Sequence, residues 1–488
     1  MKSKFKYLID QRSIRMFFLG FSAGLPLLLV FSTLSVWLTK ADIERSTITL
    51  FSWVGFAYSF KFLWTPIVDH FKLPFSDNFG HRKSWLFFSQ IMIIFSLLLA
   101  SFSDPNLSLF FMVISFILIA FSSATQDIVI DAYRIESVSQ KLQGALSSMY
   151  LAGYRIAMIV SGAGSLWFVS IQSGETYLLD SWQFVYRIMA LFMIIGIVTT
   201  ILSKEPNIKR KITGSSSDQI KFIFSILTSI IIFFIIYLNF PELSYENKLL
   251  NFSYDLIKIL ISFISMILLL NIYVKINFIK TDKAKIAYIH PILDFVKRYN
   301  KLAIFILLLI SLYRISDIVM GVMANIFYVE KGYTLKDIAF FSKFLGLFAT
   351  ISGGILGGIF AMNFGALRAL LIGSIIAALT NILFAILAIS ETDTFLLASV
   401  IIADNIASGF AGAAFIVFLS SITSIKFTAT QYALFSSLML FIPKLIAGYS
   451  GLLVNVVGYP FFFIISAVIG LPVIFLILFI NNIQISKK

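Results

Sequence analysis

The sequence predicts an all-α integral membrane protein of about 14 spans, built as two parallel six-helix halves plus two extra central helices. Three observations predict this fold class. Of the 488 residues, 59% are hydrophobic and only 13% are charged, whereas soluble domains average about 25% charged residues. Apolar runs of membrane-spanning length recur along the whole chain. Short motifs of the first half also return, in the same order, in the second half.

Each expected span is an apolar run of about 20 residues, the length that crosses a bilayer as a helix. In the first half these runs lie near residues 14–38, 46–68, 85–102, 107–131, 144–169 and 183–202. The two extra spans lie near residues 220–239 and 255–274. In the second half the runs lie near residues 302–324, 334–361, 366–389, 395–424, 429–455 and 459–480. No small-residue cleavage site follows the first run, so we expect a retained span rather than a signal peptide.

The distribution of basic residues sets the expected topology. Of the 38 Lys and Arg residues, 26 lie in loops and tails on one side, five lie in the opposite loops, and seven lie within spans. Because Lys and Arg accumulate in cytoplasmic loops, both termini are expected to be cytoplasmic. Most of the net charge of +14 therefore comes from these cytoplasmic loops. Because membrane topology accounts for this charge, no nucleic acid partner is expected.

Composition also excludes several kinds of chemistry. The chain has no cysteine, which removes disulfides, thiolate zinc sites and iron–sulfur clusters. Its three histidines lie in or beside loops, so neither a metal site nor a cofactor is expected. No ATP-binding motif and no hydrolase or metalloprotease motif is present. We therefore expect that the chain is not an enzyme. The energy for transport must then come from an ion gradient or from the substrate's own gradient.

The internal repeat divides the chain into two halves of the same orientation. The loop GHRKSW at 80–85 matches NFGALR at 363–368, each following an apolar span. ALSSMY precedes Arg155 and ALFSSL precedes Lys444, and in both halves a Ser-Gly pair begins six residues after the cation. Parallel six-span halves are the plan of major facilitator transporters. We therefore expect an N-terminal half at 1–205, a C-terminal half at 302–488, and between them a linker at 206–301 that carries the extra spans and a cytoplasmic amphipathic segment.

Nine ionisable residues lie within the expected spans at positions where exposure to lipid is implausible or at least costly. Exposing all of them to lipid would cost on the order of 20–30 kcal/mol, so they must face one another or water. Arg155, Lys444 and Arg314 lie near mid-membrane, where cations suit an anionic substrate with several carboxylates. The structural alternatives are interhelical salt bridges for Arg155 and Lys444, and an intrahelical pair of Arg314 with Asp317.

The remaining charges are candidates for proton coupling or gating. Asp127 and Asp131 lie one helical turn apart near the cytoplasmic end of the fourth span, where neighbouring carboxylates readily exchange protons. Hydration at the headgroups, or pairing with Arg134, is the alternative. The other candidates are Asp317, Lys61, which either pairs with the aspartates or snorkels to the inner surface, and two residues expected toward the outer side, Lys343 and Asp404.

A third group is expected to join helices at the loop between the second and third spans. Asp69, which ends the second span, lies close in sequence to Arg82 and Lys83 of the GHRKSW loop. We expect these three residues to form a structural latch of ion pairs between helices.

Longer motifs resemble one known family. GFSAGLP at 20–26, FKFLWTPIVD at 60–69, SATQDIVIDAYR at 123–134, GYRIAMIVSG at 153–162 and TATQYALFSSL at 428–438 are similar to the AmpG family of muropeptide permeases of Gram-negative bacteria. The resemblance covers both halves and implies proton-driven import of anhydromuropeptides (GlcNAc-anhydroMurNAc peptides) from the periplasm across the inner membrane for cell-wall recycling. A sugar-peptide substrate also needs aromatic and amide groups, for which the candidates are Gln126, Tyr154, Asn405, Trp64 and Tyr313.

Two other functions stay open at this point. The same fold can carry a different anionic solute, such as a nucleotide-linked or acyl-CoA metabolite. A membrane-embedded transferase using Asp127 and Asp131 is disfavoured by the repeat and by the absence of His and Cys from the spans. The expected partners are the small-molecule substrate, protons and the lipid bilayer, and the protein is expected to be a monomer.

Overall fold

The structure is a computed structural model that describes residues 6–43, 51–174, 176–208, 216–241, 248–279, 289–447 and 450–485. Every regular element in these ranges is helical, which confirms the expected all-helical class. Within them, eleven helices are long and apolar enough to cross a membrane. The count of 14 spans stays a prediction, because several expected spans are broken or run together in the described chain.

The first half consists mainly of long helices that pack around one apolar core. Its first span bends at Phe31, which separates α2 from α3. The fifth span changes to a π-helical turn after α10 and continues as α11. The helical segments that build its spans, apart from the second, are α2 (Gln11–Val30), α3 (Ser32–Lys40), α8 (His81–Ala100), α9 (Leu109–Ser137), α10 (Gln143–Ile159), η5 (Val160–Gly164), α11 (Ser165–Ser173), α12 (Leu179–Phe192) and α13 (Ile194–Leu202).

The second span departs from the sequence prediction, because residues 51–70 do not form one continuous helix. They form four short pieces, η2 (Phe51–Gly55), α5 (Phe56–Ser59), η3 (Lys61–Leu63) and α6 (Thr65–His70). Pro66 lies in the first turn of α6, where its missing N–H and fixed φ favour a new helix start over continuation of the previous helix. Non-helical backbone at membrane depth has to be shielded from lipid by protein.

The two extra helices supply part of that shielding. α14 (Ser216–Leu238) and α15 (Lys248–Lys275) form a hairpin against the broken segment. The ring of Phe60 lies 5.2 Å from that of Phe233 on α14 and 5.6 Å from that of Phe263 on α15. Ile230 and Phe233 of α14 and Met266 of α15 belong to the same apolar core as the first half. The hairpin thus packs on the first half, over the segment whose backbone most needs cover.

The second half has its own apolar core. Phe295 of α17 packs on Phe435 of α24 at 5.0 Å, and Arg298 donates to the carbonyl of Ile422 at 2.9 Å. The short amphipathic helix α17 is therefore anchored to this half. The helices of the second half are α17 (His290–Tyr299), α18 (Leu302–Leu312), α19 (Ile315–Glu330), α20 (Leu335–Ile338), η7 (Ala339–Leu345), α21 (Gly346–Phe364), α22 (Ala366–Ile389), α23 (Thr394–Ile422), η8 (Ile425–Phe427), α24 (Thr428–Ala447), α25 (Ser450–Ile469) and α26 (Leu471–Ile485).

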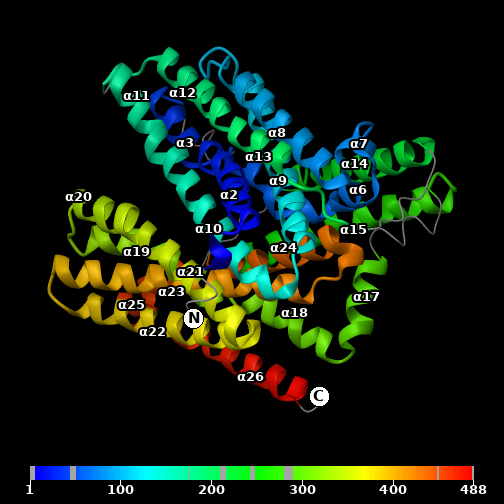
Figure 1. The fold of residues 1–488 in the computed structure, drawn as a ribbon. Coiled ribbons are helices and arrows are strands. Elements are labelled where there is room, and N and C mark those ends of the chain that lie inside the picture. Colours follow the sequence, from blue (N-terminus) through cyan, green and yellow to red (C-terminus); the bar gives the residue numbers. More distant parts are fainter. Residues whose placement is uncertain are drawn as a thin grey trace.

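The two halves diverge at one end of the molecule and contact each other at the other end. Figure 1 shows α11 and α12 far from α20, while α24 lies beside α9. We call the contacting end the latch end. There Gln140 donates to the carbonyl of Ser421 at 3.4 Å, and Ser148 of α10 donates to the carbonyl of Gly354 on α21 at 2.9 Å.

Glycine permits the closest of these approaches. A Cβ added to Gly144 of α10 would lie 2.3 Å from the carbonyl oxygen of Gly358 on α21, nearer than any real side chain comes. Small residues allow helix backbones to meet in this way, and packing of this kind holds helices together where lipid gives no hydrophobic drive. Closure of the latch end therefore depends on the missing side chains at Gly144 and at Gly358, where an added Cβ would lie 2.4 Å from the Gly144 carbonyl oxygen.

We predict that Gly144→Ala forces the latch end apart. Spin labels on Gln140→Cys and Ser421→Cys report the separation, and the natural chain has no cysteine to interfere. The mean label distance should rise in the variant, as measured by double electron–electron resonance. Gly321→Ala is the matched control, because an added Cβ there meets nothing within 4 Å. Equal distances in the two variants would show that the contact at Gly144 does not set closure.

Candidate functional site

A buried ion-pair network lies at the latch end. Arg82, which is 1% exposed, donates to Asp69 at 2.7 Å and to both carboxylate oxygens of Glu136 at 2.7 and 3.0 Å. Asp69 also accepts from the backbone N–H and the hydroxyl of Thr430 on α24, at 2.9 and 2.8 Å. Asp69 therefore links the second span, the third span and the opposite half.

Lys83 lies beside this network but does not take part in it. Its ammonium donates to the carbonyl of Ile201 at 3.1 Å, within its own half, and lies 4.4 Å from the ring centre of Phe79. The backbone N–H groups of Arg82 and Lys83 donate to the carboxylate of Glu205, a favourable place for an anion at a helix N-terminus. Of the three expected latch residues, Asp69 and Arg82 meet in the ion-pair network, and Lys83 packs on α13.

Arg134 makes a second contact between the halves. It is fully buried and donates to Ser147 of its own half at 3.1 Å and to Ser420 of α23 at 2.8 Å. Its guanidinium also lies 5.2 Å from the ring centre of Tyr432 on α24, a cation–π distance. A charge that is fully desolvated needs partners of this number and quality.

Beside this contact lies the N-half cluster, formed by Lys61, Asp127, Asp131 and Arg134. Asp131 pairs with Arg134 at 3.2 Å and with Lys61 at 3.8 Å. Lys61 is 9% exposed, so in this arrangement it points to the aspartates rather than snorkelling. The charges of Lys61 and Asp131 act electrostatically on Asp127. The buried Oδ1 of Asp127 has no hydrogen-bond partner among the described residues.

The C-half cluster consists of Arg314, Asp317 and Asp404. Arg314 pairs with Asp317 one turn later at 2.5 Å. Ser408 donates to Asp317 at 3.4 Å, and Thr380 donates to Asp404 at 3.1 Å. The intrahelical pair considered from the sequence is therefore present, and α23 brings Asp404 within range of both charges of that pair.

Arg155 connects the two halves electrostatically. It projects from α10 of the first half, yet the charges of Arg314 and Asp317 in the second half act on it. The Nε atoms of Arg155 and Arg314 are buried and have no hydrogen-bond partner among the described residues. Buried polar groups are normally satisfied, so exceptions that involve charges need an explanation. Arg82 Nη1 and Arg134 Nε also lack a partner, but the other donors of these two side chains are bonded at the latch end. Of the remaining charged groups, Asp127, Arg155 and Arg314 have spare hydrogen-bonding atoms among the described residues, and they mark the candidate site.

Other candidates from the sequence are used for helix packing in this conformation. Gln126 is fully buried, accepts from the hydroxyl of Ser22 at 2.6 Å and donates to the Ser22 carbonyl at 3.0 Å. Asn405 accepts from Thr350 at 2.8 Å and donates to Ile401 at 2.8 Å. Neither amide therefore presents a free group to a substrate.

The aromatic candidates divide between the site and the helix interfaces. Tyr154 is half-buried beside Tyr150, near the charges of Asp127 and Arg155. Tyr313 stacks on Phe415 at 4.7 Å. Trp64 lines a separate apolar cavity and donates to Thr125 at 3.1 Å, so the structure does not place it in the charged site.

Two expected cations lie outside what the structure describes. The side chains of Lys343 and Lys444 belong to the undescribed part of the chain, although helical backbone is described at both positions, in η7 and α24. Their expected roles at a gate and opposite Arg155 therefore stay predictions.

Sequence reasoning missed several partners of the charged residues. Glu136, Glu205, Ser420, Thr430 and Tyr432 had no assigned role, although the last two lie in the TATQYALFSSL motif. Their contacts are long-range, up to 361 residues apart along the chain. The only available signal was the likeness of that motif to its counterpart in the first half.

Two helical halves that meet around buried charges are the architecture of a membrane transporter. The family model of the Major Facilitator Superfamily matches residues 16–448, and the chain belongs to this superfamily. Its fold is similar to the crystal structure of FucP in the outward conformation, with a TM-score of 0.62 at 10% identity, covering 97% of this chain and 99% of that one. It is also similar to the human organic anion transporter MFSD10, with a TM-score of 0.58 at 12% identity, covering 96% and 99%.

Within the superfamily, the chain is AmpG-like. It is 32% identical over 473 residues to the putative transporter AmpG 4 of Rickettsia conorii, covering 97% of both chains. It is 30% identical over 480 residues to the anhydromuropeptide permease of Escherichia coli K12, covering 98% of this chain and 82% of that one. The resemblance seen in the sequence motifs is confirmed, and so is the expectation of a transporter rather than an enzyme.

We predict that Arg82→Met destabilises the protein by about 3–5 kcal/mol, the usual cost of leaving buried partner charges unpaired. Asp69 and Glu136 would then lose the guanidinium that they share. The midpoint of thermal unfolding in detergent measures the effect. Lys83→Met is the matched control, since Lys83 lies outside the network and should cost much less. Equal losses in the two variants would contradict the assignment of Arg82 as the centre of the latch.

Proposed function

We propose that the protein is a proton-coupled importer of anhydromuropeptides, carrying them from the periplasm to the cytoplasm for cell-wall recycling. The observation that carries the proposal is the set of unsatisfied charges on Asp127, Arg155 and Arg314, inside the spans of an AmpG-like transporter. The proposed working unit is a monomer in the bacterial inner membrane. Its proposed division is an N-terminal half at 1–205, a linker with two extra spans at 206–301, and a C-terminal half at 302–488.

The proposed direction of transport rests on the positive-inside rule. The segments between the spans at the latch end, with the first turn of α8, carry Lys72, Arg82, Lys83, Lys141 and Lys204, which favours the cytoplasm for that end and for both termini. On this assignment the conformation is closed to the cytoplasm, and its halves diverge toward the periplasm. Alternating access then requires the contacts of Asp69 with Thr430 and of Arg134 with Ser420 to break.

Substrate binding is assigned to the cations between the halves. Anhydromuropeptides carry carboxylates, and guanidinium groups bind carboxylates through paired hydrogen bonds. Arg155 retains a spare donor and is not paired in the described structure with a carboxylate at salt-bridge distance. Arg314 keeps one spare donor besides its bond to Asp317. Lys444 is proposed as the counterpart of Arg155 on the basis of the sequence repeat, and Tyr154 as an aromatic contact for the sugar.

Proton coupling is assigned to the N-half cluster. Asp131 already has two cationic partners, whereas Asp127 competes for the same Lys61 with an unsatisfied carboxylate oxygen. Protonating Asp127 would remove one of two negative charges beside Lys61 and strengthen the Lys61–Asp131 pair. Asp317, Asp404 and Lys343 are proposed as gating residues that respond to substrate.

A different anionic solute, such as a nucleotide-linked or acyl-CoA metabolite, is the competing cargo. Arg155 and Arg314 would favour any multiply anionic ligand, so the charges alone do not choose among them. Competition for uptake between such solutes and a labelled anhydromuropeptide separates the two proposals. A transferase would instead show turnover in detergent without any gradient.

We predict that proteoliposomes containing the protein accumulate labelled anhydromuropeptide when a proton gradient is imposed, and that a protonophore abolishes the accumulation. Asp127→Asn, which cannot ionise, should lose accumulation but keep exchange of labelled for unlabelled substrate, because exchange needs no net proton movement. Accumulation that survives the protonophore would refute proton coupling, and accumulation by the variant would remove Asp127 from the mechanism.

We further predict that Arg155→Ala lowers anhydromuropeptide uptake at least tenfold while membrane insertion and thermal stability are retained. The physical reason is loss of a carboxylate-binding donor that makes few contacts within the protein. Uptake is measured in cells against protein level in the membrane. Arg187→Ala is the control, since Arg187 lies on α12 with its guanidinium 5.6 Å from the ring centre of Phe102 and 3.4 Å from the Gln183 oxygen. Normal uptake by Arg155→Ala would assign Arg155 a structural role.

A further inference from the structure

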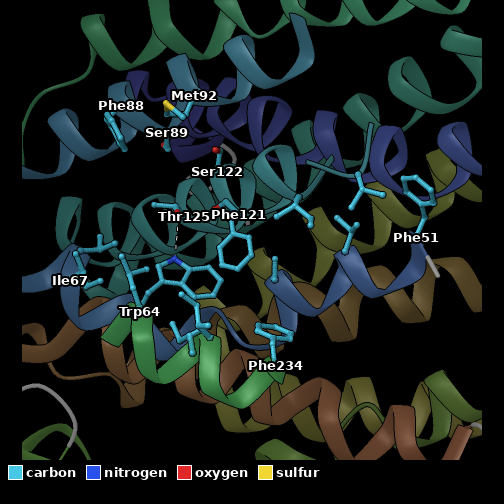
Figure 2. Close-up of a pocket in the computed structure, with 18 of the residues that line it drawn as sticks. Phe51, Trp64, Ile67, Phe88, Ser89, Met92, Phe121, Ser122, Thr125 and Phe234 are labelled. Atoms are coloured by element: carbon cyan, nitrogen blue, oxygen red, sulfur yellow. Dashed lines mark hydrogen bonds between the residues drawn. The ribbon is translucent and has the colours of Figure 1, made fainter. Parts of the chain in front are cut away.

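A large apolar cavity lies behind the broken second span, away from the charged site. Its volume is about 810 Å³, within the range of about 300–1,000 Å³ typical of ligand pockets. The walls come from the broken segment, α8, α9 and α14. Figure 2 shows an elongated set of lining residues that extends from Ile67 to Phe51, with Trp64, Phe121 and Phe234 between them.

The lining of the cavity has few free hydrogen-bonding groups for a polar ligand or for water. The indole of Trp64 donates to Thr125, whose hydroxyl donates in turn to the carbonyl of Phe121. Ser89 donates to the carbonyl of Leu86. These three polar groups are therefore already satisfied within the protein. Ser122 and Tyr237 also bring hydroxyl groups to the lining, but most of the lining residues are apolar. A buried water needs two to four polar partners, and large cavities lined by apolar side chains stay dry. A muropeptide, with its sugars and carboxylates, is excluded for the same reason.

The cavity also opens toward the bilayer side of the molecule. Three partly exposed side chains line the cavity on this side. They are Phe88 of α8, which is 40% exposed, and Leu227 and Ile231 of α14, which are 49% and 55% exposed. All three lie in helices long and apolar enough to span the membrane. Lipid hydrocarbon surrounds such helices. An apolar chain is therefore the kind of group that can enter the cavity from this side. Interiors elsewhere are close-packed, and an empty space of this size would forfeit the contacts of its whole lining.

We propose that this cavity binds one acyl chain of a membrane phospholipid, held between the α14–α15 hairpin and the first half. The occupant completes the cover over the broken second span, where α14 leaves a gap beside Trp64 and Val54. The same segment carries Lys61, which pairs with Asp131 on its other side. The bound chain thus supports, from behind, the segment that positions a charge of the transport site. The proposal does not depend on the identity of the cargo.

Native mass spectrometry of the full-length protein in mild detergent tests the proposal. Wild-type protein should retain one phospholipid through extensive detergent washing. Val113→Trp fills the cavity from α9 and should lower the retained fraction at least tenfold. Val198→Trp is the matched control, since Val198 is 48% exposed on α13 and does not line the cavity, and it should retain lipid as the wild type does. Equal retention by all three proteins, or no retained phospholipid in the wild type, would overturn the proposal.

A second measurement uses unaltered protein and so does not depend on the folding of a variant. Cryo-electron microscopy of the wild type in phospholipid nanodiscs should show elongated density between α9 and α14. Brominated acyl chains should place strong bromine scattering there. Density that is absent, or broken into separate water-sized peaks, would overturn the proposal even if the transport function stands.

Discussion

The cost of burying ionised side chains among membrane-spanning helices governs this structure. Arg82 and Arg134 are almost fully buried, and each is kept in place by several oxygens or an aromatic face supplied by other helices. Removing two charges from water costs several kcal/mol per ion, and only good geometry recovers it. Because some of the partners lie on the opposite half, satisfying these charges also fixes how the halves meet. Polar contacts of this kind can be exchanged for water when the halves separate, which an apolar interface of the same area would resist.

A related constraint applies to the backbone. The second span is broken into short pieces, and non-helical peptide groups are not tolerated against lipid. The hairpin of α14 and α15 answers this requirement through aromatic packing of Phe60 on Phe233 and Phe263. Lys61 lies in one of these short pieces, and its ammonium is 3.8 Å from the carboxylate of Asp131. The extra helices are thus connected physically to the transport site, although they lie outside it.

The distribution of satisfied and unsatisfied polar groups separates structure from function within the membrane. Gln126 and Asn405 have polar side chains at membrane depth, yet their amides are bonded to neighbouring helices. Asp127, Arg155 and Arg314 keep buried atoms without partners in the described chain. Arg82 and Arg134 each keep one such atom as well, but their other donors are bonded to groups at the latch end. The bonded amides stabilise one arrangement of helices, whereas the spare atoms of Asp127, Arg155 and Arg314 are available to a ligand or a proton. Position in the sequence does not distinguish them, because both kinds lie in similar apolar contexts.

The sequence by itself determined the class of protein, because composition, span length and the internal repeat are local or statistical properties of the chain. It also determined that charges such as Asp127, Asp131 and Arg155 need partners, since the cost of burial does not depend on the fold. Only the tertiary structure decided which partners they have. Asp69 accepts a hydrogen bond from Thr430, which lies 361 residues away along the chain, and Arg134 donates to Ser420, which lies 286 residues away. The side-chain oxygen of Gln126 accepts a hydrogen bond from Ser22. Such pairings depend on the angle and register at which distant helices cross, and no periodicity along one helix encodes them.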